Sequence, residues 1–363
     1  MIDLVQLRRE PDIVKAALAR RGVSSAAMDE IIALDVEHRE LLQEAERLRA
    51  EVKFLSRSVG EARRDKDTDT AVSLTEKSRA LGEDERAATE AMERVGNKLR
   101  DELLMIPNLP DPGVPDGVDE NDNVELRRWW PGMDEGRPFP EFADHQKVPH
   151  WDAALELGIL DLEAGARIAG SMFPLFRGAG SRLIRSLSAL SLDRNAGAYE
   201  EIHPPTFALT ATMMSTGHLP KSADDMYGIE RDGLWAIPTA EVPLTSMHAG
   251  EILDEASLPI RLCAETACFR REAGAAGRDT RGVLRVHEFD KVELFAYCTP
   301  EQGSVAFDDI LARAESLLQE LGLTYRLLNL CTGDLGTSSA NLGRWPVDVM
   351  VSVSTTVGGR ISS

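Results

Sequence analysis

Apolar residues recur at heptad spacing along the first third of the chain. From Met28 to about Leu104 the sequence holds almost no proline or aromatic residue. A repeat of about 3.5 residues is typical of packed helices that share an apolar seam. In the first segment the seam consists of Ile31, Leu34, His38, Leu41, Ala45, Leu48, Val52, Leu55 and Val59. In the second segment it consists of Leu74, Ser78, Leu81, Glu85, Ala88, Met92, Val95 and Leu99.

The seam is interrupted near Gly60 by the polar run EARRDKDTDT. A break this short predicts that the second helix returns antiparallel to the first. Each helix would have about 35 residues and a length of roughly 50 Å. We therefore expect an antiparallel coiled-coil arm over about residues 29–104, within a first domain of residues 1–106.

A Pro-, Gly- and Asp-rich linker over residues 107–123 separates the arm from a region with a different pattern of apolar residues. From about residue 124, short apolar runs follow one another across tight loops, which favours a mostly antiparallel sheet. Strands are expected over residues 200–203, 233–237, 260–269, 284–289, 292–298 and 325–331, and helices over residues 181–192 and 300–321. The predicted fold class is α/β (α+β), with this sheet and its flanking helices in residues 124–340.

The charge balance limits the partners of the protein. A formal net charge of -20 and a pI near 4.8 argue against a generally basic nucleic-acid coat, so RNA would need a local basic patch, and DNA is not expected as a partner. From Arg39 to Lys66 the arm carries eight basic and six acidic residues. This stretch is either a solvated face of mixed ion pairs or an arm that follows a phosphate backbone.

Other features exclude several protein classes. The charged start MIDLVQLRREPD predicts neither a signal peptide nor a membrane span, so the expected location is cytoplasmic. The four cysteines show no CxxC spacing and are expected to be reduced core thiols rather than metal ligands. The glycine-rich and metal-binding motifs GxGxxG, GxxxxGK[ST], HExxH and GxSxG are missing from the sequence.

The strongest candidate for chemistry is the stretch ACFRREAGAAGRDTRGVLRVHEFDKVE, residues 267–293. We expect a strand through Arg271, a loop over residues 274–282 and a returning strand over residues 283–293. The period of two residues places Arg270 and Glu272 on one side, and Phe289 and Glu293 on one face. These groups offer a guanidinium for a phosphate, an aromatic face for a base and a carboxylate for an ammonium group.

A second unusual stretch is IPTAEVPLT, residues 237–245. Glu241 lies near two prolines in an apolar run, where local partners for a carboxylate are scarce. The alternatives are a surface turn that happens to carry a glutamate and a substrate-binding carboxylate.

Taken together, these stretches resemble the bacterial-type seryl-tRNA synthetases, which are class II aminoacyl-tRNA synthetases. The resemblance runs from MIDL to about Ala340 and covers RREPDIVKAALARRG, the arm, MIPNLPDPGVPDG, TGHLPK, IPTAEVPLT, the stretch 267–293 (motif 2) and LCTGDLG. It implies a serine–tRNA ligase that forms seryl-adenylate from ATP and serine and transfers the seryl group to tRNA-Ser. It also implies a homodimer built around motif 1, AYEEIHPP, although the helix before this motif is shorter than in the family, and Mg²⁺ bound with ATP.

The resemblance assigns roles to individual residues. ATP would be bound by Arg270 at the α-phosphate, with Glu272 at the adenine amino group, and by Arg271, Val286 and Phe289; of these, Arg270 and Glu272 would be catalytic. Serine would be held by Thr239, Ala240, Glu241 and Glu293. The loop of residues 274–282 would meet the acceptor end of the tRNA and the arm its long variable branch. Residues assigned to tRNA are Arg57, Arg63, Arg64, Lys66, Arg278 and Arg281.

The resemblance stops after GDLGTSSA. The family continues with later strands and with the arginine-bearing helix of motif 3, whereas this chain reads NLGRWPVDVMVSVSTTVGGRISS. Three features of the family have no counterpart here. They are the later strand with the ATP-side Glu and Ser, which is also the Mg²⁺ ligand strand, the motif-3 arginine, and the group that checks the serine hydroxyl. Because one set of codons for residues 341–345 reads Thr-Trp-Asp-Val in another frame, we expect residues 341–363 to be a tail translated out of frame.

Three functional readings follow from these observations. The first is a serine–tRNA ligase, and the second is an inactive remnant that binds tRNA or dimerises without aminoacylating. The third is a paralogue that charges another carrier, against which the intact arm argues, because such relatives lack it.

Overall fold

The structure is a computed structural model that describes residues 2–141, 143, 147–274, 280–344 and 350–353, the last two strands by their backbone alone. The chain divides into two compact units, Met1–Pro107 and Asn108–Ser363. Within the described residues, no helix has the length and apolar character needed to cross a membrane.

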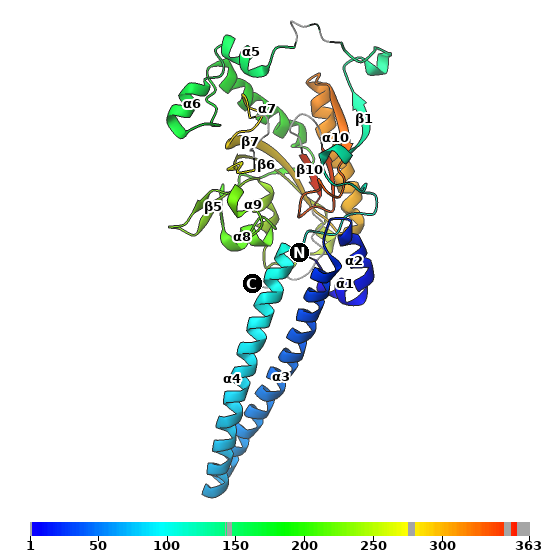
Figure 1. The fold of residues 1–363 in the computed structure, drawn as a ribbon. Helices are drawn as coiled ribbons and strands as arrows, with labels where there is room; N and C mark the ends of the chain where they lie inside the picture. Colours follow the sequence, from blue (N-terminus) through cyan, green and yellow to red (C-terminus); the bar gives the residue numbers. More distant parts are fainter. Residues whose placement is uncertain (1, 142, 144–146, 275–279, 345–349, 354–363) are drawn as a thin grey trace. The chain divides into compact units, whose positions relative to one another are not determined.

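The first unit is helical (Figure 1). Its elements are α1 (Leu4–Arg9), α2 (Pro11–Ala19), α3 (Ser25–Arg64) and α4 (Thr68–Met105). The side chains of Ser24 and Asp67 accept hydrogen bonds from the first turns of α3 and α4, which fixes where the long helices begin. Lys66, with φ of 60°, lies in the turn between them.

The two long helices form the predicted antiparallel pair, which confirms the arm. Contacts between them join Arg49 to Glu85 and Ser56 to Ser78, so partner numbers rise in one helix as they fall in the other. All predicted seam positions are buried or half-buried. At the polar seam position His38, α4 offers Gly96, where a Cβ atom would lie 3.0 Å from the imidazole Nε2. The glycine therefore makes room for the histidine.

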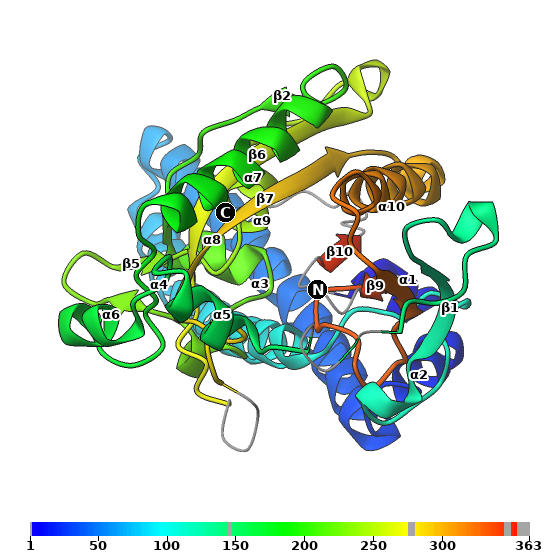
Figure 2. The same ribbon diagram turned by 90° about the horizontal axis from the view of Figure 1, so that it is seen from above.

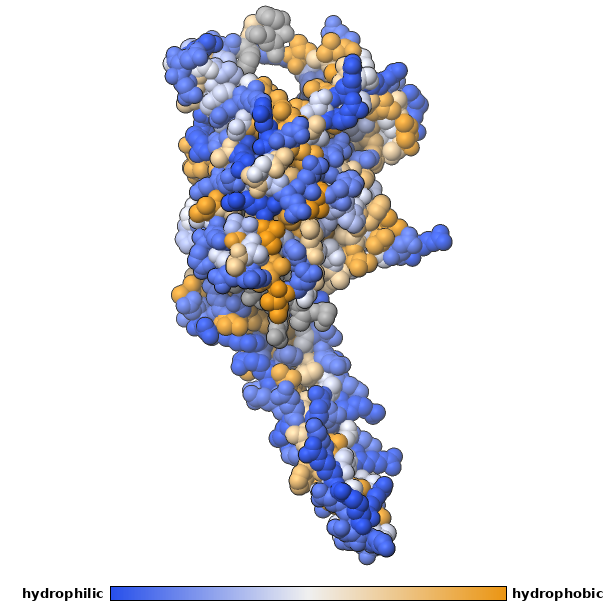
Figure 3. Space-filling model, turned by 180° about the vertical axis from the view of Figure 1, so that it is seen from behind, coloured by the Kyte–Doolittle hydropathy of each residue, from blue (hydrophilic) through white to orange (hydrophobic). Residues whose placement is uncertain are grey.

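The helices are longer than predicted, with 40 residues in α3 and 38 in α4. The seam weakens near Gly60, but the following residues are good helix formers, so α3 continues to Arg64. The exposed surface of this arm is mostly hydrophilic (Figure 3), with single apolar side chains such as Phe54 exposed between polar ones.

The described residues of the second unit form three small sheets. The first has the order β1-β8-β9-β10, with antiparallel pairing throughout. The second has the order β2-β6-β7, and the third β3-β5-β4. Among the described strands, only β2 and β6 pair in parallel, so the prediction of a mostly antiparallel sheet is confirmed. The strands are β1 (Val124–Trp129), β2 (Glu200–Glu201), β3 (Phe207–Leu209), β4 (Gly228–Ile229), β5 (Leu234–Ala236), β6 (Ile260–Phe269), β7 (Glu288–Tyr297), β8 (Tyr325–Asn329), β9 (Asn341–Arg344) and β10 (Met350–Val353).

Helices flank these sheets (Figure 2). They are α5 (His150–Glu156), α6 (Leu162–Ala169), α7 (Ala179–Asn195), α8 (Thr210–Ser215), α9 (Glu241–Ser246) and α10 (Gly303–Glu320). Short 3₁₀ turns include η4 (Ala223–Asp225) and η6 (Pro300–Gln302), and a capping box on Thr299 begins the second of these.

The β6–β7 ladder separates two cores because its side chains alternate. One face carries Cys263 and Leu294, which pack in a cluster with α7, α10 and β8. The opposite face carries Leu262 and Ala264, which pack under α9. The α9 face is therefore shared by alternate residues of both strands, which are 262, 264, 266 and 268 of β6 and 289, 291, 293, 295 and 297 of β7.

Several predicted boundaries were wrong. Residues 284–289 and 292–298 were expected to be two strands, but Glu288–Tyr297 is one continuous strand, and residues 283–287 form turns. The polar pair Asp290–Lys291 does not end the strand, because Asp290 is exposed on one face and Lys291 is bonded on the other. The first strand ends at Phe269 rather than Arg271.

Candidate functional site

The candidate site lies at the end of the α9 face that the helix leaves uncovered. The segment Ile237–Leu244 runs along this face and connects its two ends. At one end Phe269 N donates to the Ile237 carbonyl at 2.8 Å, and at the other Tyr297 Oη donates to the Leu244 carbonyl. Ala240, Val242 and Leu244 are fully buried. IPTAEVPLT is therefore not a surface turn but the packed start of α9.

Arg270 and Phe289 form one end of the site. The Arg270 guanidinium carbon lies 5.1 Å from the centre of the Phe289 ring, a cation–π geometry. Its Nε donates to the Pro238 carbonyl at 3.4 Å, and its backbone N–H donates to the His287 carbonyl at 2.9 Å. Backbone and side chain together hold the guanidinium over the ladder.

Thr239, Lys291 and Glu293 form the other end. Thr239 Oγ1 donates to Glu293 Oε2 at 2.8 Å, and Lys291 Nζ donates to Thr239 Oγ1 at 2.6 Å. Lys291 Nζ also lies 2.5 Å from Glu293 Oε2. The Glu241 backbone N–H donates to Thr239 Oγ1 at 3.2 Å, so this residue joins the same group through its backbone. Lys291 is the partner that explains how the half-buried Glu293 carboxylate is tolerated.

Glu272 lies outside the strand alternation that was expected to place it beside Arg270. Its φ of 51° turns the chain in the left-handed region, which is uncommon for a residue with a Cβ atom. Its Oε2 accepts a hydrogen bond from Arg285 Nη1 at 2.6 Å. The adjacent Ala273 N–H donates to Asp225 Oδ1 at 2.9 Å, which ties this turn to η4.

His218, which sequence reasoning did not assign to the site, adds a neutral imidazole. Burial, together with the positive charges of Arg270 and Lys291, lowers the pKa of His218 to about 4. Thr216 Oγ1 lies 3.1 Å from the Thr212 carbonyl, to which it donates, and 3.1 Å from His218 Nδ1.

Two residues assigned to ATP have other surroundings. Arg271 is exposed and its Nη1 donates to the Asp224 carbonyl at 3.0 Å. It lines a pocket of about 430 Å³ together with Tyr227 and Trp235. Val286 is half-buried in the turns before β7. The structure therefore brings together Arg270, Phe289, Thr239, Ala240 and Glu293, but does not bring Arg271 to them.

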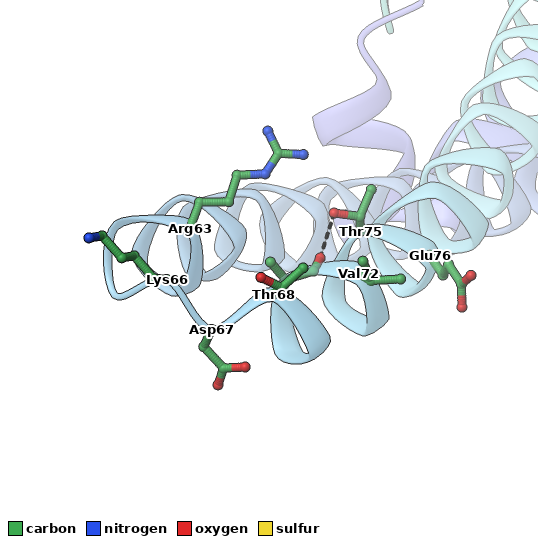
Figure 4. A pocket seen from close by; sticks show the side chains of 8 residues that line it. Arg63, Lys66, Asp67, Thr68, Val72, Thr75 and Glu76 are labelled. Carbon is green, nitrogen blue, oxygen red and sulfur yellow. Dashed lines mark hydrogen bonds between the residues drawn. The ribbon is translucent and has the colours of Figure 1, made fainter.

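The residues assigned to tRNA lie in two places. Arg278 lies outside the described residues, whereas Arg281 places its guanidinium carbon 4.6 Å from the centre of the Trp151 ring. Arg57, Arg63, Arg64 and Lys66 are exposed towards the end of α3 and in the turn after it. Figure 4 shows Arg63 and Lys66 beside a depression of about 330 Å³ at this tip. Within the described part of the chain, Arg57, Arg63 and Lys66 form no ion pair.

A signal for the missed lysine was present in the sequence. Phe289, Lys291 and Glu293 follow the period of two residues in FDKVE, so a lysine on the face of two assigned residues was predictable. His218 and Arg285 carried no comparable signal, because their contacts depend on turns whose course the sequence pattern does not specify.

Two family models match the chain. The seryl-tRNA synthetase N-terminal domain matches residues 1–110, and the tRNA synthetase class II core domain (G, H, P, S and T) matches residues 227–355.

Curated relatives and a solved structure agree with these models. A serine–tRNA ligase of Chloroflexus aurantiacus is 41% identical over 340 residues, which cover 93% of this chain and 78% of the relative. One of Synechococcus elongatus is 42% identical over 343 residues, with the same coverage. The seryl-tRNA synthetase from Pyrococcus horikoshii, solved in complex with ATP, is 35% identical with a TM-score of 0.83 and covers 95% of this chain and 80% of its own.

Proposed function

Because the chain belongs to the seryl-tRNA synthetase family, we propose that ATP and serine meet on the α9 face of the β6–β7 ladder. The activity is that of a serine–tRNA ligase, an ATP-dependent aminoacyl-tRNA synthetase. One observation carries the placement of the site. A single strand face presents an aromatic ring under a guanidinium at Phe289 and a carboxylate at Glu293, with Lys291 between them.

The nucleotide end contains Arg270. A carboxylate oxygen of serine attacks the α-phosphorus of ATP, a new oxygen–phosphorus bond forms and pyrophosphate leaves. The negative charge that develops at phosphorus is stabilised by a fixed guanidinium, which does not lose its proton at neutral pH. Phe289 and Val286 would pack on the adenine. Glu272 would accept a hydrogen bond from the adenine amino group while its carboxylate also accepts one from Arg285.

The amino-acid end contains the hydrogen-bonded group of Thr239, Ala240, Glu241 and Glu293. A carboxylate is the natural acceptor for the serine ammonium group. In the second step the terminal ribose hydroxyl of tRNA-Ser attacks the seryl carbonyl and AMP leaves. Because its pKa is lowered to about 4, His218 is neutral at pH 7 and adds no positive charge to this end.

The tRNA would contact the protein at two places that the sequence assigns. Arg278 and Arg281 would meet the acceptor end, and Arg57, Arg63, Arg64 and Lys66 would follow the phosphates of the long variable branch. The exposure of the arm-tip cations supports this assignment.

Further properties follow from the family and belong to the proposal. We place the protein in the cytoplasm as a homodimer, with the exposed Pro205 of motif 1 at the subunit interface. Mg²⁺ would arrive with ATP and be held mainly by phosphate oxygens. Among the described residues no group of three His, Cys, Asp or Glu side chains could hold a metal, so the proposal gives Mg²⁺ no protein ligand.

Serine-dependent exchange of radioactive pyrophosphate into ATP tests the proposal. The 363-residue chain is expected to catalyse this exchange when serine is present and not when serine is left out. Binding of tRNA-Ser without exchange would instead support the remnant that binds tRNA and does not aminoacylate.

A further inference from the structure

Lys291 lies at the centre of the site and has no role in the assignments above. Its position opposite Thr266 in the β6–β7 register places it on the α9 face between Phe289 and Glu293. Resting on the function proposed above, we infer that Lys291 is the positioning residue for the serine end of the site. It holds the Glu293 carboxylate so that one oxygen is presented to the substrate ammonium group.

The hydrogen bonds determine which oxygen is presented. Thr239 has one hydroxyl proton, which it donates to Glu293 Oε2, and it accepts from Lys291 and from the Glu241 backbone. Lys291 lies against the same Oε2. Both partners therefore converge on one carboxylate oxygen. Glu293 Oε1 makes no hydrogen bond to any described residue and is the atom left for the ammonium group.

Burial explains why a lysine is needed beside an ammonium site. The Glu293 side chain is 16% exposed, and burying a carboxylate is costly unless it has a close partner. Arg270 is directed to the Phe289 ring and the Pro238 carbonyl, so it does not provide that partner. Lys291 supplies the charge on the side of Oε2 and leaves the side of Oε1 to the substrate.

The geometry also separates serine from ATP. Lys291 contacts Thr239 and Glu293, the amino-acid end, whereas Phe289 and Arg270 form the nucleotide end. Loss of the lysine charge should therefore weaken the binding of serine while the binding of ATP is kept. A merely structural lysine would affect both substrates equally.

The test uses Lys291→Met, which keeps an unbranched side chain of nearly the same length and removes its charge, in pyrophosphate exchange on the full chain. We expect the KM for serine to rise at least tenfold and the KM for ATP to stay within about threefold of wild type. Lys291→Arg should recover most of the loss. The matched control is Asp290→Asn, a charge change at an exposed residue that points to the opposite side of the same strand, and it should leave both constants unchanged.

A double-mutant cycle shows whether Lys291 acts through Glu293. The variant Lys291→Met/Glu293→Gln should be no worse than Glu293→Gln alone. Multiplicative losses, a parallel rise of both KM values, or a serine KM for Lys291→Met equal to that of the control would each overturn the inference. Absence of serine-dependent exchange in the wild type would instead refute the proposed function, and this inference with it.

Discussion

The two units of this protein treat charged side chains in opposite ways. On the arm, charges lie in solvent and pair with near neighbours, as Arg47 does with Glu44 and Glu51, or remain unpaired at the tip. In the sheet unit, Arg270, Lys291 and Glu293 gather on one strand face and are half-buried. An exposed pair contributes at most about 1 kcal/mol because water and salt screen it, whereas removing one member of a buried pair leaves an uncompensated charge. The comparison teaches that burial, and not the number of charges, decides how much one charged residue matters.

The largest effect is expected where the charge meets the reaction. Arg270→Ala should lower the rate of serine-dependent exchange by about 10²- to 10³-fold, because it removes the guanidinium that stabilises the developing charge. Arg271→Ala is the matched control, since Arg271 is exposed and bonded to a backbone carbonyl. Its rate should fall less than about tenfold, or roughly 1.4 kcal/mol. Equal losses in the two variants would show that burial does not decide between these neighbours.

The helical unit also contains a buried charged residue, Asp35, which tests whether burial or the unit in which a residue lies decides its effect. Asp35 in α3 is 3% exposed, and its carboxylate bonds to Arg8 at 2.6 Å and to Arg39 at 3.1 Å. Asp35→Asn should lower the free energy of unfolding by about 2 kcal/mol, less than for a fully buried pair because Arg8 is partly exposed. Asp29→Asn, whose partner is Lys15 on the surface, should change it by less than about 0.5 kcal/mol. Urea unfolding followed by helical circular dichroism measures both.

The same carboxylate gives the expected dependence on pH. The hydrogen bond from Arg8 lowers the pKa of Asp35 below its usual value, so the folded state favours the charged form. The stabilisation is therefore complete above the unfolded pKa of about 3.9 and is lost as the pH falls through the lowered folded value. The difference in unfolding free energy between wild type and Asp35→Asn should shrink below about pH 4. A difference that stays constant down to pH 2.5 would contradict this account.

At the arm tip the effect should be collective and sensitive to salt. The triple variant Arg57→Ala/Arg63→Ala/Lys66→Ala removes three exposed, unpaired cations and should weaken the binding of tRNA-Ser about tenfold at low salt. The slope of log affinity against log salt should become less steep by up to about 3. The control triple Arg47→Ala/Arg49→Ala/Lys98→Ala removes the same charge from residues that already pair with carboxylates. An equal change of slope in both triple variants would show that the tip cations do not bind tRNA more strongly than the paired cations of the arm.

The arm could be predicted from the sequence more completely than the sheet unit. The antiparallel arm was predictable, because a heptad seam is a local pattern that recurs along most of both helices, although the helices are longer than the pattern predicted. The strand β6 was also predicted over residues 260–269, because most of its residues are apolar, but the expected extension to Arg271 was wrong. The second strand was divided wrongly at Asp290–Lys291, because Lys291 is bonded to Thr239 from elsewhere in the fold and to Glu293 of the same strand, while Asp290 is exposed. Positive φ at Glu272 and the packing of Ile237–Leu244 depend on tertiary contacts that no local pattern contains.

The smallest expected effect tests the lower end of the comparison. Arg49 and Glu85 join the two arm helices at 3.1 Å, and the Arg49 side chain is 63% exposed. Glu85 occupies a seam position, so the sequence pattern alone would suggest a larger role than its exposed partner allows. Glu85→Gln keeps the shape of the side chain and should change the free energy of unfolding by less than about 0.5 kcal/mol, and less still in 1 M salt. A loss above about 1 kcal/mol that persists in salt would mean that the seam partly desolvates this pair, and the contrast between arm and site would then be one of degree.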